Sequence, residues 1–475
     1  MSENKTGFFF GAGAEVKYGF QSGAEFAIRI MNPSRDVLDN AKKDYENLGY
    51  KEKYGDFAKL SSADFQKICE SMIENRKDEI KNLFFESDKN FDKNYKNEKS
   101  DKIFDNFVEK FTKDKLPEFK LLSKAIDIRE ESRFKNDFTT LLNFNISLLF
   151  FLYGNAIIEN LNKNFFTEKF SDFFNDNDGA FMLNKNKAPV ISAKLFEVIS
   201  EQKNKNQTTE NQTEEEKIFS ELKNFTKDLI EKCIDYQKLF ENFDALFYPE
   251  KNKTQFRKIV SLLLIMRQTI LQKQIKTEKQ ENQSQTKSYY DEIVADSEIT
   301  LGSVCTTNYS TFYDEKFAQR MGTKVFHLNG KIDSFFDLDS KSIYEDSLSE
   351  IKDKISKNIV PFLYPQVAMK PIMYFDVVKL YSDAYKSLAE CSKVAVLGFG
   401  FNKDDNLLNG MFKLLLEGNK NLEIFYFDYK KQTSKDENKF FKDLGLAEYK
   451  NRFKIFKLED NHLVDDENWL KKLKG

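Results

Sequence analysis

Several short segments of the sequence carry residue types that could do chemistry on a nucleotide. Gly11-Ala12-Gly13 follows an apolar stretch and precedes a predicted helix. Glycines there let the backbone approach a diphosphate, and the free N–H groups of the helix N-terminus bind it. The same pattern also forms plain structural turns, and a carboxylate at Glu15 repels phosphate unless it points away. This segment therefore predicts either a diphosphate site or a turn.

Two further segments end predicted strands with polar side chains. Thr307-Asn308 follows a predicted strand at 303–306, where an Asn binds a ribose hydroxyl, holds a water or closes an Asx-turn. His327 ends a predicted strand at 324–327, where a neutral imidazole could be a general base, although a lone histidine is more often structural. The other histidine, His462, lies in a charged segment and is predicted to be solvated at the surface.

The last candidate segments are a glycine turn and an acid. Gly398-Phe399-Gly400 follows a predicted strand at 394–398, and Asp428 ends a predicted strand at 423–428. An acid at such a strand end can bind the hydroxyls of an adenosine ribose. Both segments could equally be turn or cap residues.

The elements that position these segments are short strands alternating with helices. From about residue 298 onward we predict strands at 303–306, 324–327, 360–364, 394–398, 423–428 and 453–456, and helices at 375–388 and 406–415. The N-terminus adds a strand ending at Phe10 and a helix at 23–31, which Asn32-Pro33-Ser34 ends. This alternation is typical of a doubly wound parallel sheet.

The middle of the chain has a different pattern of apolar and polar residues. Apolar residues there recur at helical spacing, as at Phe138, Leu141 and Leu142, which predicts amphipathic helices. The stretches 202–216 and 273–287 almost lack apolar residues and are predicted to be loops or linkers. We expect residues 1–35 and 296–475 to form one discontinuous α/β domain and residues 36–295 to form a helical insertion.

Composition excludes several classes of protein. Among 475 residues, 74 Lys and Arg nearly balance 77 Asp and Glu, so nucleic-acid binding is not indicated. Four widely spaced cysteines form no Cys-x-x-Cys zinc pair, and two histidines argue against a multi-histidine metal site. No apolar run approaches the roughly 20 residues of a membrane span, and no signal peptide is recognised, so we expect a cytoplasmic protein.

Taken in order, these segments resemble the sirtuin superfamily, and more closely the sirtuin-like NAD-hydrolysing effectors of bacterial antiphage defence. The resemblance covers residues 1–35 and 296–475 and implies a Rossmann-type parallel sheet. It implies that Asn308 and His327 are catalytic. The NAD contacts that it implies are Gly11, Ala12, Gly13, Ser22, Thr307, Gly398, Phe399, Gly400 and Asp428.

Some positions depart from the family pattern. Glu15 stands where the family has Ser, Ser310 stands where it often has Asp, and the His-Gly pair is stretched to His327-Leu328-Asn329-Gly330. Nothing here could form the four-cysteine zinc module of protein-deacylating sirtuins. The resemblance therefore implies the zinc-free branch, with NAD as substrate.

The activity implied by the resemblance is that of an NAD+ glycohydrolase, which releases nicotinamide and ADP-ribose or a cyclised form of it. Asn308 would hold the ribose or the water, and His327 would accept a proton from either. The implied output is NAD+ depletion in abortive infection. The helical insertion would serve homo-oligomerisation, sensing of a phage-derived trigger, or docking of a partner such as an ATPase. The alternatives are a non-catalytic NAD or ADP-ribose sensor and an NAD-dependent deacylase or ADP-ribosyltransferase.

Overall fold

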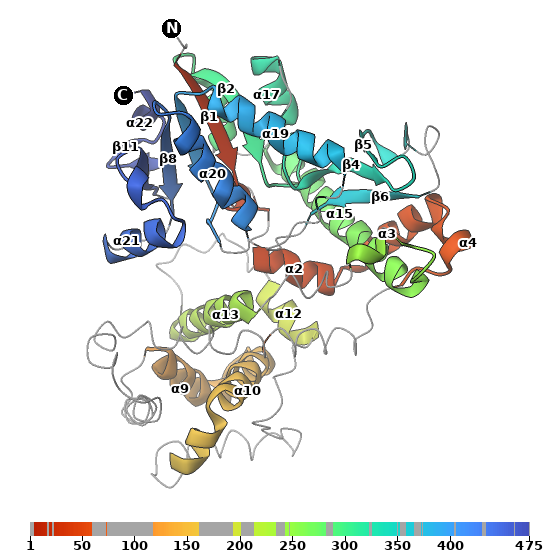
Figure 1. Ribbon diagram of the computed structural model, residues 1–475. Coiled ribbons are helices and arrows are strands. Elements are labelled where there is room, and N and C mark those ends of the chain that lie inside the picture. The colour runs from red at the N-terminus through yellow and green to blue at the C-terminus, as the bar shows by residue number, and fades with distance from the viewer. Residues whose placement is uncertain are drawn as a thin grey trace. The chain divides into compact units, whose positions relative to one another are not determined.

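The chain divides into two compact units (Figure 1). Unit 1 comprises residues 1–59 and 240–475, and unit 2 comprises residues 60–239. The computed structural model describes residues 4–16, 19–20, 23–58, 73, 117–160, 193–200, 213–233, 243–246, 248–281, 288–322, 325–348, 350–351, 358–364, 372, 374–402, 405–429, 434–459 and 461–474.

The centre of unit 1 is a six-stranded parallel sheet in the order β3-β2-β1-β7-β8-β9. Its strands are β1 (Lys5–Phe10), β2 (Thr300–Thr306), β3 (Phe326–His327), β7 (Lys393–Leu397), β8 (Glu423–Asp428) and β9 (Phe453–Lys457). The chain winds outward in one direction through β2 and β3 and in the other through β8 and β9. The strand order thus reverses between β1 and β7, as in Rossmann-like doubly wound folds, which bind ligands beyond the strand ends at such a point. The predicted α/β sheet is confirmed in this coarse form.

Alternation along the strands explains why helices cover both faces of the sheet. Phe9 faces a core formed with α19 (Phe375–Ala389), α20 (Asn406–Gly418) and α21 (Ser434–Asp443). Phe8 and Phe10 face the opposite core, formed with α16 (Tyr289–Ala295), α17 (Asp314–Met321) and the C-terminal residues up to α22 (Lys471–Lys474). The central strands β1, β7 and β8 are therefore buried on both sides, which suits their nearly continuous apolar sequences.

A second, antiparallel sheet in unit 1 was not predicted. It consists of β5 (Ser342–Glu345), β4 (Gly330–Asp337) and β6 (Ile359–Leu363), in that order. The strand predicted at 360–364 exists as β6, but it pairs with β4 and lies outside the parallel sheet. Gly330 has a φ of 82° and approaches the backbone of Phe362 closely, so this position requires glycine.

Helices from the predicted insertion belong to unit 1. The long helix α15 (Lys253–Glu281) contacts α3 (Arg35–Asn47) and β6, and α4 (Tyr50–Tyr54) follows α3. Tyr50 donates a hydrogen bond to the carbonyl of Ile359, and Tyr54 donates one to Asn358 over 3.1 Å. The limits of unit 1 at residues 59 and 240 therefore differ from the predicted domain limits at 35 and 296, because these helices pack on the small sheet.

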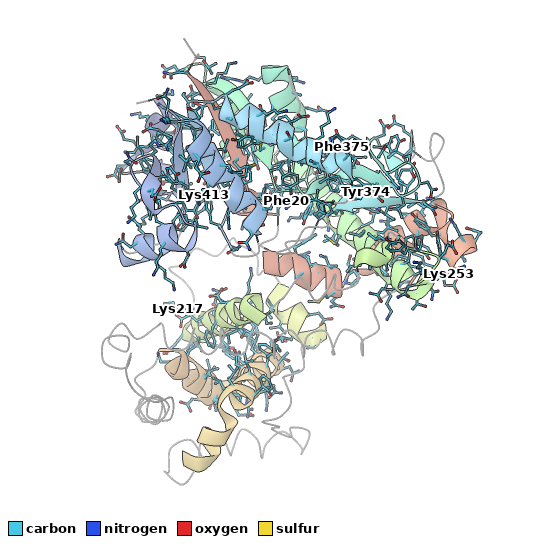
Figure 2. All side chains as sticks on the ribbon, viewed as in Figure 1. Phe20, Lys217, Lys253, Tyr374, Phe375 and Lys413 are labelled. Atoms are coloured by element: carbon cyan, nitrogen blue, oxygen red, sulfur yellow. The ribbon has the colours of Figure 1, made fainter. Side chains whose placement is uncertain are left out.

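Several helices of unit 1 lie where the sequence predicted them. The helix predicted at 23–31 is α2 (Gly23–Met31), and Ser34 caps α3 after the predicted break. The predicted helices at 375–388 and 406–415 are α19 and α20, and the exposed ring of Phe375 begins α19 next to the buried Tyr374 (Figure 2). The remaining elements are α1 (Gly13–Val16), η2 (Phe243–Leu246), η4 (Ala447–Tyr449), β10 (Leu463–Val464) and β11 (Glu467–Asn468).

Some local expectations were wrong. Residues 273–281 were predicted to lie in a loop, but they complete α15, because a polar stretch can extend a helix that packs elsewhere along its length. Residues 214–216, also predicted to lie in a loop, begin α13 (Glu214–Cys233). His462 was predicted to be solvated, but only 6% of it is exposed. It stacks on Tyr289, and its Nδ1 lies at hydrogen-bond distance, 3.1 Å, from a carboxylate oxygen of Glu292. The charged neighbours in sequence point to solvent while the imidazole turns inward.

Unit 2, in its described residues, is helical. Its helices are α9 (Pro117–Arg129), α10 (Lys135–Asn160), α12 (Ala193–Ser200) and α13 (Glu214–Cys233). Leu141 and Leu142 of α10 are buried, as their helical spacing predicts, and Asn145 donates a hydrogen bond to Thr226 over 2.7 Å. Among the helices that the structure describes, none has the length and apolarity needed to cross a membrane.

Candidate functional site

Two glycine turns meet where the strand order reverses. The Gly11 N–H donates to the Leu397 carbonyl over 2.9 Å, and the Gly13 N–H donates to the Gly398 carbonyl over 2.9 Å. Gly398 has a φ of 66°, and a Cβ atom built on it would lie 1.9 Å from the Ala14 nitrogen. Close packing of the turns after β1 and β7 therefore requires these glycines, whether or not a diphosphate binds there.

The Asn308 side chain is anchored to the first of these turns. Its amide Nδ2 donates to the Gly11 carbonyl over 3.2 Å, and its backbone N–H donates to Thr306 Oγ1 over 3.0 Å. The Thr307 N–H donates to the Phe10 carbonyl over 2.9 Å. The polar loop after β2 is thus tied directly to the end of β1.

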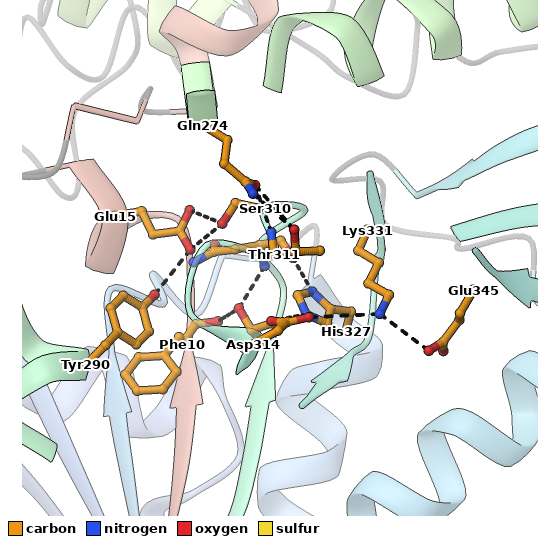
Figure 3. A network of polar contacts seen from close by, with 12 residues as sticks. Phe10, Glu15, Gln274, Tyr290, Ser310, Thr311, Asp314, His327, Lys331 and Glu345 are labelled. Carbon is orange, nitrogen blue, oxygen red and sulfur yellow. Dashed lines mark hydrogen bonds and ion pairs between the residues drawn. The ribbon is translucent and has the colours of Figure 1, made fainter. Parts of the chain in front are cut away.

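His327 connects this loop to Asp314 at the start of α17. Its Nδ1 lies 2.9 Å from the Asn308 carbonyl, and its Nε2 lies 2.9 and 3.0 Å from the two Asp314 oxygens. A carbonyl only accepts hydrogen bonds, so Nδ1 is the donor to Asn308, while Nε2 faces the Asp314 carboxylate. Lys331 adds a cation 3.9 Å from Asp314 and 3.4 Å from Glu345 (Figure 3). Both ring nitrogens are therefore engaged by neighbouring groups.

Glu15 forms a second polar group at the same edge of the sheet. Its side chain turns toward the loop after β2, where Ser310 Oγ lies 2.8 Å from both carboxylate oxygens (Figure 3). The Tyr290 hydroxyl on α16 donates to the same carboxylate over 3.2 Å. Burial raises the pKa of Glu15 to about 7, against the opposing effect of these hydrogen bonds, of Asn308 and of the nearby His327 charge. The two departures from the family pattern, Glu15 and Ser310, thus bind each other.

The long helix α15 holds the loops that carry these residues. Gln274 accepts a hydrogen bond from the Thr311 N–H over 3.0 Å, next to Ser310. Arg267, buried on the same helix, donates to the Ile332 carbonyl over 2.7 Å and pairs with Asp44 over 3.1 Å. The loop after β2 and the start of β4 are therefore both fastened to α15.

Comparisons with known proteins add nothing to this geometry. No family model matches the chain, and no curated protein or solved structure matches it either. The resemblance to sirtuin-like proteins remains a prediction from the sequence. What the structure shows is a Rossmann-like parallel sheet with polar residues at its carboxyl edge.

The structure brings most of the predicted site residues to this edge. Gly11, Gly13 and Gly398 contact one another, with Ala12 and Gly400 in the same two turns. Thr307, Asn308 and His327 lie at the ends of the neighbouring strands.

Other predicted residues are placed differently. The Phe399 side chain is buried in the core against Phe9, so only the backbone at this position belongs to the turn. Asp428 ends β8, two strands from β1, and is buried. Ser22 lies outside the described residues.

Sequence reasoning missed Asp314, Tyr290 and Gln274 as partners of this site. Asp314 follows Tyr313 at a helix start, so its pattern indicates only a first-turn acid. Tyr290 and Gln274 lie in or near the polar stretch that was expected to be a linker. Among the residues that the structure describes, no group of three or more His, Cys, Asp or Glu side chains is arranged to hold a metal ion.

Proposed function

We propose that this protein is an NAD+ glycohydrolase that cleaves the bond between nicotinamide and ribose. The observation that carries the proposal is the convergence of Asn308, His327 and Glu15 at the carboxyl ends of β1, β2 and β3, beside the reversal of strand order. A dinucleotide on a sheet of this order lies across that reversal. Its diphosphate would then lie over the two glycine turns and its nicotinamide ribose near Asn308.

The reaction needs a held ribose, a placed water and an environment that tolerates positive charge. Nicotinamide leaves as a neutral base, and an oxocarbenium-like centre develops at the anomeric carbon. The Asn308 side chain is anchored through Nδ2 to Gly11, and its amide oxygen would accept a hydrogen bond from a ribose hydroxyl or a water. The Glu15 carboxylate, when ionised, favours the developing cation. His327 fixes the position of Asn308 through its backbone carbonyl.

Nicotinamide release by the purified full-length chain tests the proposal. Chromatography should show NAD+ consumption by the wild type and a rate lower by about 10²–10³-fold in Asn308→Ala. Asn145→Ala is a matched control, because Asn145 is also buried and hydrogen-bonded but lies in unit 2. Its turnover should equal that of the wild type.

Two results would contradict the proposal. Intact NAD+ after prolonged incubation with the wild type would do so, and measurable NAD+ binding without cleavage would favour the sensor alternative. Equal loss of activity in Asn308→Ala and Asn145→Ala would assign the loss to folding. Depletion of NAD+ as a defence output, and oligomerisation or partner docking by the helices of unit 2, remain proposals that follow from the resemblance.

A further inference from the structure

We propose that Glu15, and not His327, accepts the proton of the attacking water, while His327 acts as a positioning residue. This inference rests on the proposed function, since it names the proton acceptor of the same reaction. It departs from the role that the resemblance implies for His327.

The contacts of His327 leave it no nitrogen with which to accept a proton. Nδ1 lies 2.9 Å from the Asn308 carbonyl, and Nε2 lies 2.9 and 3.0 Å from the Asp314 oxygens. The imidazole between these two partners holds the loop that carries Asn308, and neither ring nitrogen is left to face a water.

Glu15 has the opposite arrangement. Its carboxylate meets only donors: the Ser310 hydroxyl and the Asn308 side chain from the loop after β2, and the Tyr290 hydroxyl from α16. Each hydroxyl has one proton to give, and an ionised carboxylate offers about four lone-pair positions, so acceptor capacity remains. The charged or titratable groups that act on it are Tyr290, through a hydrogen bond, and His327, whose charge lowers the pKa of Glu15.

The proton affinity of Glu15 agrees with this geometry. Burial raises the pKa of Glu15 to about 7, whereas the neighbouring donors lower it. A general base is most effective when its pKa lies near the working pH.

The bond between C1′ and the nicotinamide nitrogen breaks, and its electron pair leaves with nicotinamide. A bond forms between C1′ and the water oxygen, and one water proton moves to a Glu15 carboxylate oxygen. Release of that proton to solvent completes the conversion of NAD+ and water into ADP-ribose, nicotinamide and H+.

The test is the pH dependence of kcat for nicotinamide release by the full chain. Below a pH of about 7, kcat of the wild type should fall as Glu15 becomes protonated. This fall is the acid limb of the pH profile. Glu15→Gln keeps the size of the side chain and should lose about 10²–10⁴-fold in kcat together with this acid limb. Ser310→Ala removes a donor to the carboxylate and should move the limb to higher pH by about one unit. Tyr290→Phe should move it in the same direction.

Asp314→Asn distinguishes a positioning role of His327 from a proton-accepting role of the same residue. It should lower kcat by loosening His327, yet the profile should keep an acid limb, because Glu15 is still present. Loss of the acid limb in Asp314→Asn, together with an unmoved limb in Ser310→Ala, would overturn the inference and return the proton-accepting role to His327. Retention of wild-type kcat by Glu15→Gln would also overturn it.

The outcomes distinguish this inference from the proposed function. A wild type that releases no nicotinamide contradicts both. A wild type that cleaves NAD+ with a limb insensitive to Ser310→Ala and Tyr290→Phe contradicts the role of Glu15 alone. Should Glu15→Gln fail to fold, judged by circular dichroism, the two hydroxyl variants still decide the matter.

Discussion

The two histidines of the chain, His327 and His462, lie in two regions of unit 1 and have similar surroundings at first sight. Each is 6% exposed and each contacts a carboxylate, Asp314 in one case and Glu292 in the other. His462, however, stacks on Tyr289 in an aromatic core, and Glu292 also accepts a hydrogen bond from Trp469 over 2.7 Å. His327 instead touches the backbone of Asn308 at the carboxyl edge of the sheet.

The difference shows that burial and a carboxylate partner do not by themselves indicate chemistry. The region around His462 joins the C-terminal residues to α16 and packs Trp469 against Phe8 and Phe427. Such contacts stabilise the fold. The region around His327 gathers charges and a buried acid at strand ends, which costs stability and is typical of functional sites. The two regions should therefore respond in opposite ways to mutation.

The largest expected effect is on stability at the His462 region. Trp469 is fully buried and packs edge-to-face on Phe8, Phe427 and Tyr289. Trp469→Ala should lower the free energy of unfolding by about 3–5 kcal/mol, because it removes a large side chain and leaves a cavity. Urea denaturation measures this loss, and the exposed Lys471→Ala should change stability by less than about 0.5 kcal/mol. A loss of similar size in both variants would contradict the assignment of this region to the core.

The second expected effect is a gain in the free energy of unfolding, and it lies in the His327 region. The pKa of Glu15 is about 7 in the folded protein against an ordinary value of 4.5. Between these two pH values the folded state binds more protons than the unfolded state, so stability falls as pH rises through this window. Glu15→Gln removes this pH dependence. The difference in free energy of unfolding between the variant and the wild type should therefore favour the variant by about 3 kcal/mol more above pH 7 than below pH 4.5. Denaturation curves at both pH values measure it, and a constant difference would contradict the buried charge.

The smallest effect compares the two histidines directly. His327→Gln should lower NAD+ cleavage by about 10²-fold, because Asn308 shifts from its place when the imidazole bridge is lost. His462→Gln should leave the rate unchanged and lower the free energy of unfolding by about 1–2 kcal/mol. Nicotinamide release and urea denaturation of both variants check the pair. Equal rates in the two variants would contradict the different roles assigned to the two histidines.

Much of the large sheet could be predicted because its strands are local patterns. The runs that end at Phe10, Leu397 and Asp428 are short, apolar and bounded by turn residues, so each indicates a buried strand without reference to the rest of the chain. The small sheet was missed because β4 mixes polar and apolar residues and depends on pairing with β5 and β6. The site was predicted in part for the same reason: Asn308 and His327 end such strands.

The sequence by itself determined the strands, the glycine turns and the polar residues that follow them, since these depend on neighbours along the chain. Only the tertiary structure decided what those residues bind. Glu15 meets Ser310 across 295 positions of sequence, and no local pattern encodes such a contact. The contacts of His327 likewise depend on Asp314 and on the Asn308 carbonyl, which the fold places on opposite sides of the ring. Charge and hydrogen bonding act through space, so the chemistry of this edge follows from the fold.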